Sequence, residues 1–305
     1  MRGAERMIKR GLFVYNQSAG KSQNGKPLAE ILDILKQGTE TLLVHEGKDP
    51  EEVKEFLEDE ENLFDFVWIF GGDGSVHLCV DSLRRRKKVP GVGILPGGTC
   101  NDFARSLGLP MDPVQAAKVT MEQNLVWIDL GCYNGRAFTN FAGVGIIADT
   151  SENIDEGAKE KIGRVSYFMS AWQTMRDAET FSYTLTADGE KISGDAVMIL
   201  VCNGRFIGTV GLPFPTINMG DEVLDIVILE DAGAMLFREW LHRSGKKEPV
   251  WDTEGVKHFQ AGSIRLETSP VKKLDTDGEI EAETPVDIGV LPKALAFACG
   301  QDERF

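Results

Sequence analysis

Two glycine-rich stretches contain most of the residues in this sequence that could do chemistry. The first, Gly71-Gly72-Asp73-Gly74-Ser75, follows five large apolar residues, Phe66 to Phe70, and precedes a segment with the apolar period of a helix. A strand, a glycine turn and a helix together bring backbone N–H groups and a helix N-terminus up to a phosphate. Glycine suits such a turn because a Cβ would block both positive φ values and the close approach. Asp73 would repel a phosphate unless a cation lay between them, so this stretch predicts a nucleotide–Mg²⁺ site.

Two further polar turns have the same setting. Asn16-Gln17-Ser18-Ala19-Gly20 follows the strand-like Leu12–Tyr15, and Pro96-Gly97-Gly98-Thr99-Cys100-Asn101-Asp102 follows the strand-like Val92–Leu95. Helical patterns come after both turns. Strands that alternate with helices indicate a doubly wound parallel sheet, in which ligands bind beyond the carboxyl ends of the strands. All three turns lie at such ends, so we expect them to converge on one ligand.

The pattern changes after Asp112-Pro113, where short strands begin to dominate. Arg136–Val144 is predicted as one strand, Ile162–Met175 as a helix, and Asp188-Gly189 as the turn of a β-hairpin. These elements indicate a mostly antiparallel region, which we predict to be a β-sandwich.

The length of the chain, 305 residues, favours two domains. We predict an α/β nucleotide-binding domain over residues 1–130, with a doubly wound and mostly parallel sheet that residues 295–305 could complete. We predict a β-sandwich domain over residues 131–294, which would bind the second substrate.

Composition and charge exclude several classes of function. The formal net charge is −15, which argues against nucleic-acid binding and against a polybasic membrane anchor. No run of about 18 apolar residues occurs, so no transmembrane helix is predicted. The N-terminal residues lack the apolar core of a signal peptide. The five cysteines have no C-x-x-C spacing, so we expect a reduced, cytoplasmic protein.

With both glycine stretches in hand, the chain resembles the diacylglycerol kinase catalytic family, and most of all its soluble bacterial lipid kinases. Gly71–Ser75 matches the family pattern G-G-D-G-T with Ser for Thr, and Gly98–Arg105 matches G-T-x-N-D-x-A-R without change. Asn16–Gly20 matches N-P-x-[SA]-G with Gln for Pro. The G-G-D-G pattern also occurs in NAD kinases, whose fold the N-terminal domain is expected to share.

The second half of the chain carries the resemblance to its end. Asn203-Gly204 matches the N-G turn of the family, and Asp277-Gly278-Glu279 matches the D-G-E turn. Leu224-Asp225-Ile226 matches the L-D-V that follows D-G, but Glu222 replaces the glycine there.

The resemblance implies ATP-dependent transfer of the γ-phosphoryl group to a lipid hydroxyl, with diacylglycerol converted to phosphatidic acid. It implies that Asp73, Asp102 and Asp129 hold Mg²⁺ partly through water, and that Asp221 holds a separate structural Mg²⁺, which the change at Glu222 leaves open. The ATP-binding residues that it implies are Asn16, Ser18, Gly20, Gly71, Gly72, Gly74, Ser75, Gly97, Gly98, Thr99 and Asn101.

Two carboxylates are candidates for the general base that accepts the proton of the lipid hydroxyl. The resemblance places Glu279 on the second domain, where the acceptor would enter. Mg²⁺ would hold Asp73 ionised among the phosphate turns and make it the poorer base. We therefore assign proton acceptance to Glu279 and metal binding to Asp73.

The sequence leaves other acceptors and a non-catalytic function open. The acceptor could be a sphingoid lipid, phosphatidylglycerol or NAD, or the chain could be a non-catalytic nucleotide or lipid sensor on the same fold. A lipid substrate requires transient, peripheral contact with a membrane, for which the apolar Ala232–Arg243 is the first candidate and the basic Arg84–Lys88 the second. The sequence leaves the oligomeric state, including a homodimer, undecided.

Overall fold

The structure is a computed structural model that describes residues 7–16, 26–148, 179–230 and 255–300. The chain forms two compact units, residues 1–128 with 293–305, and residues 129–292. Ser18, Gly20, the helix predicted over Ile162–Met175 and the apolar segment Ala232–Arg243 lie outside the described residues. No helix in the described ranges is long and apolar enough to cross a membrane.

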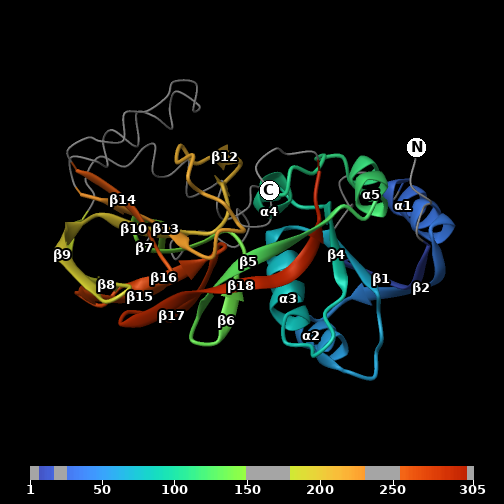
Figure 1. The fold of residues 1–305 in the computed structure, drawn as a ribbon, viewed down its shortest axis with the longest axis horizontal. Coiled ribbons are helices and arrows are strands. Elements are labelled where there is room, and N and C mark those ends of the chain that lie inside the picture. Colours follow the sequence, from blue (N-terminus) through green and yellow to red (C-terminus); the bar gives the residue numbers. More distant parts are fainter. Residues whose placement is uncertain (1–6, 17–25, 149–178, 231–254, 301–305) are drawn as a thin grey trace. The chain divides into compact units, whose positions relative to one another are not determined.

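The first unit alternates strands with helices along a parallel sheet (Figure 1). Its strands run in the order β2-β1-β3-β4, and the end of β18 (Val286–Ala298) pairs in parallel with β4. This is the predicted doubly wound sheet, and the fold class is confirmed. The elements are β1 (Ile8–Asn16), α1 (Lys26–Gln37), β2 (Thr39–Gly47), α2 (Pro50–Glu58), β3 (Phe66–Gly71), α3 (Asp73–Leu83), β4 (Gly91–Pro96), α4 (Asp102–Ser106) and α5 (Pro113–Met121).

The sheet of the first unit is held between helices. All six residues of β3 are buried, as expected of a strand covered on both faces. Figure 1 shows α1 and α5 on one side of the strands and α2 and α3 on the other. Apolar side chains of α1 and α5 share one buried cluster with Phe66, Trp68 and Phe70 of β3. The Trp68 indole N–H donates to the Thr120 hydroxyl of α5 at 3.2 Å, which satisfies the polar atom of a fully buried ring.

Most strands of the second unit belong to two sheets, and β11 and β12 form a small sheet of their own. Strands β14-β13-β10-β7-β16-β17 form one antiparallel sheet, and the first part of β18 begins the other, in the order β18-β15-β8-β9. The strands are β5 (Leu125–Tyr133), β6 (Arg136–Phe138), β7 (Phe141–Gly145), β8 (Phe181–Ala187), β9 (Glu190–Ala196), β10 (Met198–Cys202), β11 (Phe206–Ile207), β12 (Val210–Gly211), β13 (Leu224–Leu229), β14 (Val256–Ala261), β15 (Ser263–Ser269), β16 (Lys273–Thr276) and β17 (Glu279–Glu283).

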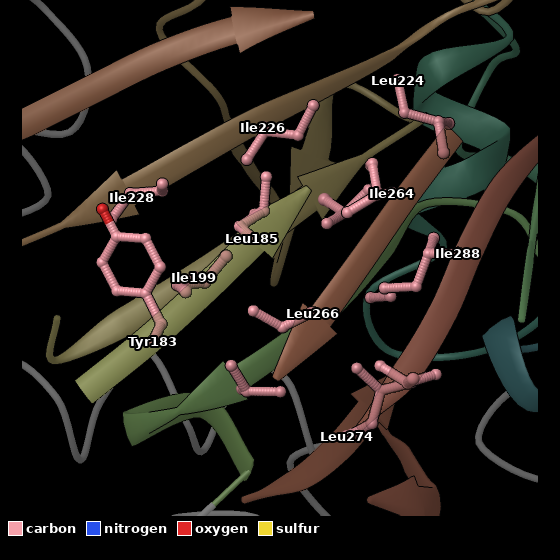
Figure 2. Packing of buried hydrophobic residues seen from close by; sticks show 14 of the residues in the cluster. Tyr183, Leu185, Ile199, Leu224, Ile226, Ile228, Ile264, Leu266, Leu274 and Ile288 are labelled. Carbon is pink, nitrogen blue, oxygen red and sulfur yellow. The ribbon is translucent and has the colours of Figure 1, made fainter. Parts of the chain in front are cut away.

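The core of the second unit lies between its two sheets, as the predicted sandwich requires. Ile199 and Ile226 of one sheet and Leu185 and Leu266 of the other belong to the same buried cluster (Figure 2). Burial of such side chains contributes about 25 cal/mol for each Å² of apolar surface removed from water.

The segment Arg136–Val144, predicted as one strand, is interrupted. It forms β6 and β7, which are separated at Thr139 and Asn140. The carboxylate of Asp277 accepts the backbone N–H groups of Thr139, Asn140 and Phe141 at 2.7, 2.8 and 3.1 Å. These N–H groups bond to a side chain instead of a neighbouring strand, and this is the physical reason for the break.

Candidate active site

Three strands of the first unit end together at one edge of its sheet. Strands β1, β3 and β4 are neighbours and parallel, and their register pairs Tyr15 with Phe70 and Gly71 with Pro96. The strands therefore end level with one another, at Asn16, Gly71 and Pro96. Strands β3 and β4 lead directly into the two glycine turns, which therefore lie at the edge where doubly wound sheets bind ligands. Residues 17–20, which follow β1, lie outside the described residues.

The glycine turns after β3 and β4 touch each other through their backbones. A Cβ built on Gly72 would lie 3.1 Å from the Gly98 Cα, and one built on Gly98 would lie 2.5 Å from the Gly72 Cα. The expectation of positive φ values for these glycines was wrong, because Gly72 has φ −88° and the described glycines with positive φ lie elsewhere. Glycine is required here because one turn packs on the other.

Asp73 ties the two turns together. Its two carboxylate oxygens accept the backbone N–H groups of Asn101 and Asp102, each at 2.8 Å. One carboxylate thus satisfies two backbone donors of the second glycine turn. Asn101 has φ 53°, a left-handed value that Asn tolerates better than most residues, and its carboxamide bonds to the N–H and C=O of Gly98. The second turn is thus fixed by Asp73 and by its own asparagine.

The outer surface of these turns is open. Gly74, Gly98 and Thr99 are exposed, and a Cβ built on Gly74 would have no protein atom within 4 Å. Helix α3 begins at Asp73, and its N-cap residue, Gly72, makes no side-chain cap. A phosphate could therefore approach the first turn of α3 without displacing a side chain.

Asp129 is buried in the second unit and held by a loop distant in sequence. Its backbone N–H donates to the Met219 carbonyl, and its carboxylate accepts the Glu222 N–H, both at 2.7 Å. Glu222 has φ 66°, the left-handed conformation for which glycine is favoured. The side chain of Asn203 donates to the carbonyls of Asp129 and Thr139 at 3.0 and 2.8 Å. Asp129 is therefore placed by contacts on both its backbone and its side chain.

Glu279 follows a tight turn that is anchored by another aspartate. Asp277 and Gly278 have φ values of 52° and 93°, which are typical of a two-residue hairpin turn. Besides three backbone N–H groups, the buried Asp277 carboxylate accepts the Thr139 hydroxyl at 2.8 Å. The Gly278 N–H donates to the Asp275 carboxylate at 2.8 Å. These bonds fix the backbone from which Glu279, a partly exposed residue, begins β17.

Asp277 and Asn203 are the site residues that sequence reasoning missed. Both sit in D-G and N-G pairs, which signal a turn but do not show what the side chain binds. Their partners are 138 and 74 residues away, so no local pattern could identify them.

The carboxylates expected to hold Mg²⁺ belong to different units, with Asp73 and Asp102 in the first and Asp129 in the second. In the described parts of the chain, no three His, Cys, Asp or Glu side chains form a group that could hold a metal ion. The donor set itself fits Mg²⁺, which prefers oxygen ligands and usually keeps several waters.

Comparison with known proteins agrees with the geometry. Residues 10–133 match the family described as diacylglycerol kinase catalytic domain, and residues 141–299 match the family described as YegS C-terminal NAD kinase beta sandwich-like domain. The chain is 31% identical to a Staphylococcus haemolyticus protein and 30% identical to a Staphylococcus carnosus protein, both provisionally named lipid kinases. The matches cover 93% and 92% of this chain and 94% of each relative.

Solved structures show the same relationship. A protein of Bacillus anthracis, provisionally described as a diacylglycerol kinase, superimposes with a TM-score of 0.89 at 30% identity, covering 98% of both chains. A second structure from that organism, described as a diacylglycerol kinase, gives a TM-score of 0.86 at 31% identity, covering 96% of this chain and 97% of the other. The matched family and these relatives, together with the paired glycine turns, identify a kinase. The chain belongs to the diacylglycerol kinase catalytic-domain family, among the bacterial lipid kinases.

Proposed function

We propose that the protein transfers the γ-phosphoryl group of ATP to the hydroxyl of a membrane lipid, and that this lipid is diacylglycerol, which becomes phosphatidic acid. The observation that carries the proposal is the Asp73 carboxylate, which joins two glycine turns at the carboxyl ends of β3 and β4. Phosphoryl transfer requires positioning and charge neutralisation more than covalent chemistry. A rigid pair of open backbone turns supplies the positioning.

The ATP phosphates would lie against the exposed backbone of these turns. Gly74, Gly98 and Thr99 are exposed, and a Cβ built on Gly74 would have no protein atom within 4 Å. Asn16, Gly71, Ser75 and Gly97 lie in or directly beside the same turns, at the ends of β1, β3 and β4. Ser18 and Gly20 complete the proposed phosphate-binding set from the turn after β1.

Asp73, Asp102 and Asp129 would hold Mg²⁺. The cation would neutralise charge on the phosphates during transfer. Asp102 and Asp129 are 3% and 0% exposed, and carboxylate oxygens are ligands of the kind that Mg²⁺ prefers.

Glu279 would act as the general base. The lipid hydroxyl oxygen forms a bond to the γ-phosphorus as the bond from that phosphorus to the β,γ-bridging oxygen breaks. The hydroxyl proton passes to the Glu279 carboxylate, and ADP leaves. The anchored turn at Asp277 and Gly278 supports this role because it restricts the backbone of the base.

Contact with the membrane would be transient and peripheral. The basic run Arg84–Lys88 is a poor candidate for it, because most of its cations already have protein partners. Arg84 and Arg85 pair with Asp81 at 2.6 and 2.9 Å. Arg86 is buried and donates to three backbone carbonyls. The apolar segment 232–243 stays the first candidate for this contact.

The test is a panel of acceptors with labelled ATP and Mg²⁺. Vesicles would contain diacylglycerol, phosphatidylglycerol or a sphingoid base, and NAD would be offered in solution. We expect labelled phosphatidic acid from diacylglycerol. A labelled product from another acceptor alone would refute the choice of diacylglycerol, and no product from any acceptor would refute catalysis.

The role of Glu279 is tested with a matched pair of variants. Glu279→Gln should lose turnover by about 100-fold or more, the usual contribution of a general base, yet keep Mg²⁺–ATP affinity. Glu283 lies at the exposed end of the same strand, so Glu283→Gln should retain activity. Equal activity of the two variants would place the base elsewhere, with Asp73 as the next candidate.

A further inference from the structure

A polar cluster on β13 and β14 closes the loop that precedes β13. Asp225 and Gln260 are paired across the two strands, and the Gln260 side-chain N–H₂ donates to the carboxylates of both Asp221 and Asp225, each at 3.3 Å. The Asp225 carboxylate also accepts the Thr216 hydroxyl at 2.6 Å and lies 2.7 Å from a ring nitrogen of His258. Asp225 is 1% exposed, so these neighbours replace the water it loses.

The Gln260 side chain lies between the two carboxylates that a structural Mg²⁺ would be expected to bind. Asp221 is the residue expected to bind a structural Mg²⁺, and it has Asp225 as a second acid nearby. Burial and the charge of Asp225 both act to raise the pKa of Asp221, while the Val223 N–H and Gln260 act to lower it. A bound Mg²⁺ would need near-octahedral oxygen ligands at about 2.0–2.1 Å. The carboxamide N–H₂ that donates to both acids occupies the place between them that such a cation would need.

The same loop reaches the carboxylate that we assign to catalysis. Asp221 is followed by Glu222, whose N–H donates to the Asp129 carboxylate at 2.7 Å. Met219, two residues before Asp221, accepts the Asp129 N–H at 2.7 Å. Whatever holds Asp221 in place therefore also holds the two backbone groups that orient Asp129.

We propose that Gln260 takes the place of the structural Mg²⁺ in this chain and acts as a positioning residue for Asp129. It bridges Asp221 and Asp225 through neutral hydrogen bonds and so fixes the loop from Met219 to Glu222. All residues of this bridge belong to the second unit, so the bridge does not depend on the proposed function. Only the consequence for turnover rests on the function proposed above.

The experiment is thermal unfolding of the nucleotide-free protein in chelator, in Mg²⁺ and in Ca²⁺. Wild type should have the same midpoint in all three. Gln260→Glu would place a third carboxylate beside Asp221 and Asp225, so its midpoint should fall by several degrees in chelator and recover in Ca²⁺ or Mg²⁺. Gln115→Ala removes an exposed glutamine side chain from α5 and should behave as wild type.

Two melting results would overturn the bridge. One is a wild-type midpoint that rises in Mg²⁺ and loses this rise in Asp221→Asn, because the cation would then occupy the site. The other is a Gln260→Glu variant as stable in chelator as wild type. These measurements need no substrate, so they show whether Gln260 replaces the cation even if the protein phosphorylates no lipid.

The positioning role has its own readout. Gln260→Ala should raise the Mg²⁺ concentration required for half-maximal turnover several-fold and leave the KM for lipid unchanged. A variant that is merely less stable would keep the wild-type Mg²⁺ requirement at a temperature where it is folded. An unchanged Mg²⁺ dependence would overturn the link from Gln260 to Asp129.

Discussion

Alanine placed at three glycines of the two turns should separate packing from phosphate binding. A Cβ on Gly74 meets no protein atom within 4 Å, one on Gly72 lies 3.1 Å from the Gly98 Cα, and one on Gly98 lies 2.5 Å from the Gly72 Cα. Gly74→Ala should be as stable as wild type, or more stable by about 0.5–1 kcal/mol, because alanine is the better helix former. Gly98→Ala should lose about 1–3 kcal/mol, the usual cost of overpacking, since backbone must shift. Gly72→Ala should fall between the two.

Nucleotide affinity should not follow this order of stability. If the phosphates approach the first turn of α3, even the harmless methyl group at Gly74 should weaken Mg²⁺–ATP binding by about tenfold or more, equivalent to about 1.4 kcal/mol. Urea unfolding measures the stability of each variant, and calorimetric titration with a non-hydrolysable ATP analogue measures its nucleotide affinity.

The matched control for this series is Gly262→Ala, where the nearest atom to the added Cβ is 3.7 Å away. It should change neither quantity appreciably. Wild-type affinity in Gly74→Ala would refute the phosphate site at α3. Wild-type stability in Gly98→Ala would refute the backbone contact between the turns.

Three further outcomes follow from single contacts. Asp277→Asn should lower the free energy of unfolding by about 3–5 kcal/mol, because its amide would face backbone N–H donors in a buried site. The exposed Asp287→Asn should cost about 0–1 kcal/mol, and equal urea midpoints for the two variants would contradict this prediction. Glu222→Gly should stabilise by up to about 1 kcal/mol, since it relieves a left-handed glutamate at some cost in chain entropy, and Glu222→Val should destabilise instead. Burial raises the pKa of the Cys79 thiol to about 12, so this thiol should resist alkylation below that pH until the protein unfolds; rapid labelling of the native protein would contradict the burial.

Much of the fold could be predicted because its signals are local. The apolar run before Gly71 indicates a fully buried strand, and the alternation of strands with helices indicates a parallel sheet whose turns gather at one edge. The Asp188-Gly189 pair likewise indicates a hairpin, and both residues have the positive φ values, 46° and 90°, that such a turn requires. In each case the residues that carry the signal are the ones that adopt the structure.

The tertiary structure alone decided what these residues touch. Asp73 bonds to the backbone 28 and 29 residues away, and Asp277 interrupts a strand 138 residues away, because a carboxylate takes whichever N–H groups the fold brings to it. The glycine motifs could be recognised from sequence, but the reason for Gly72 lies in the approach of Gly98. Sequence separation conceals such contacts, since they depend on which strands the fold places side by side.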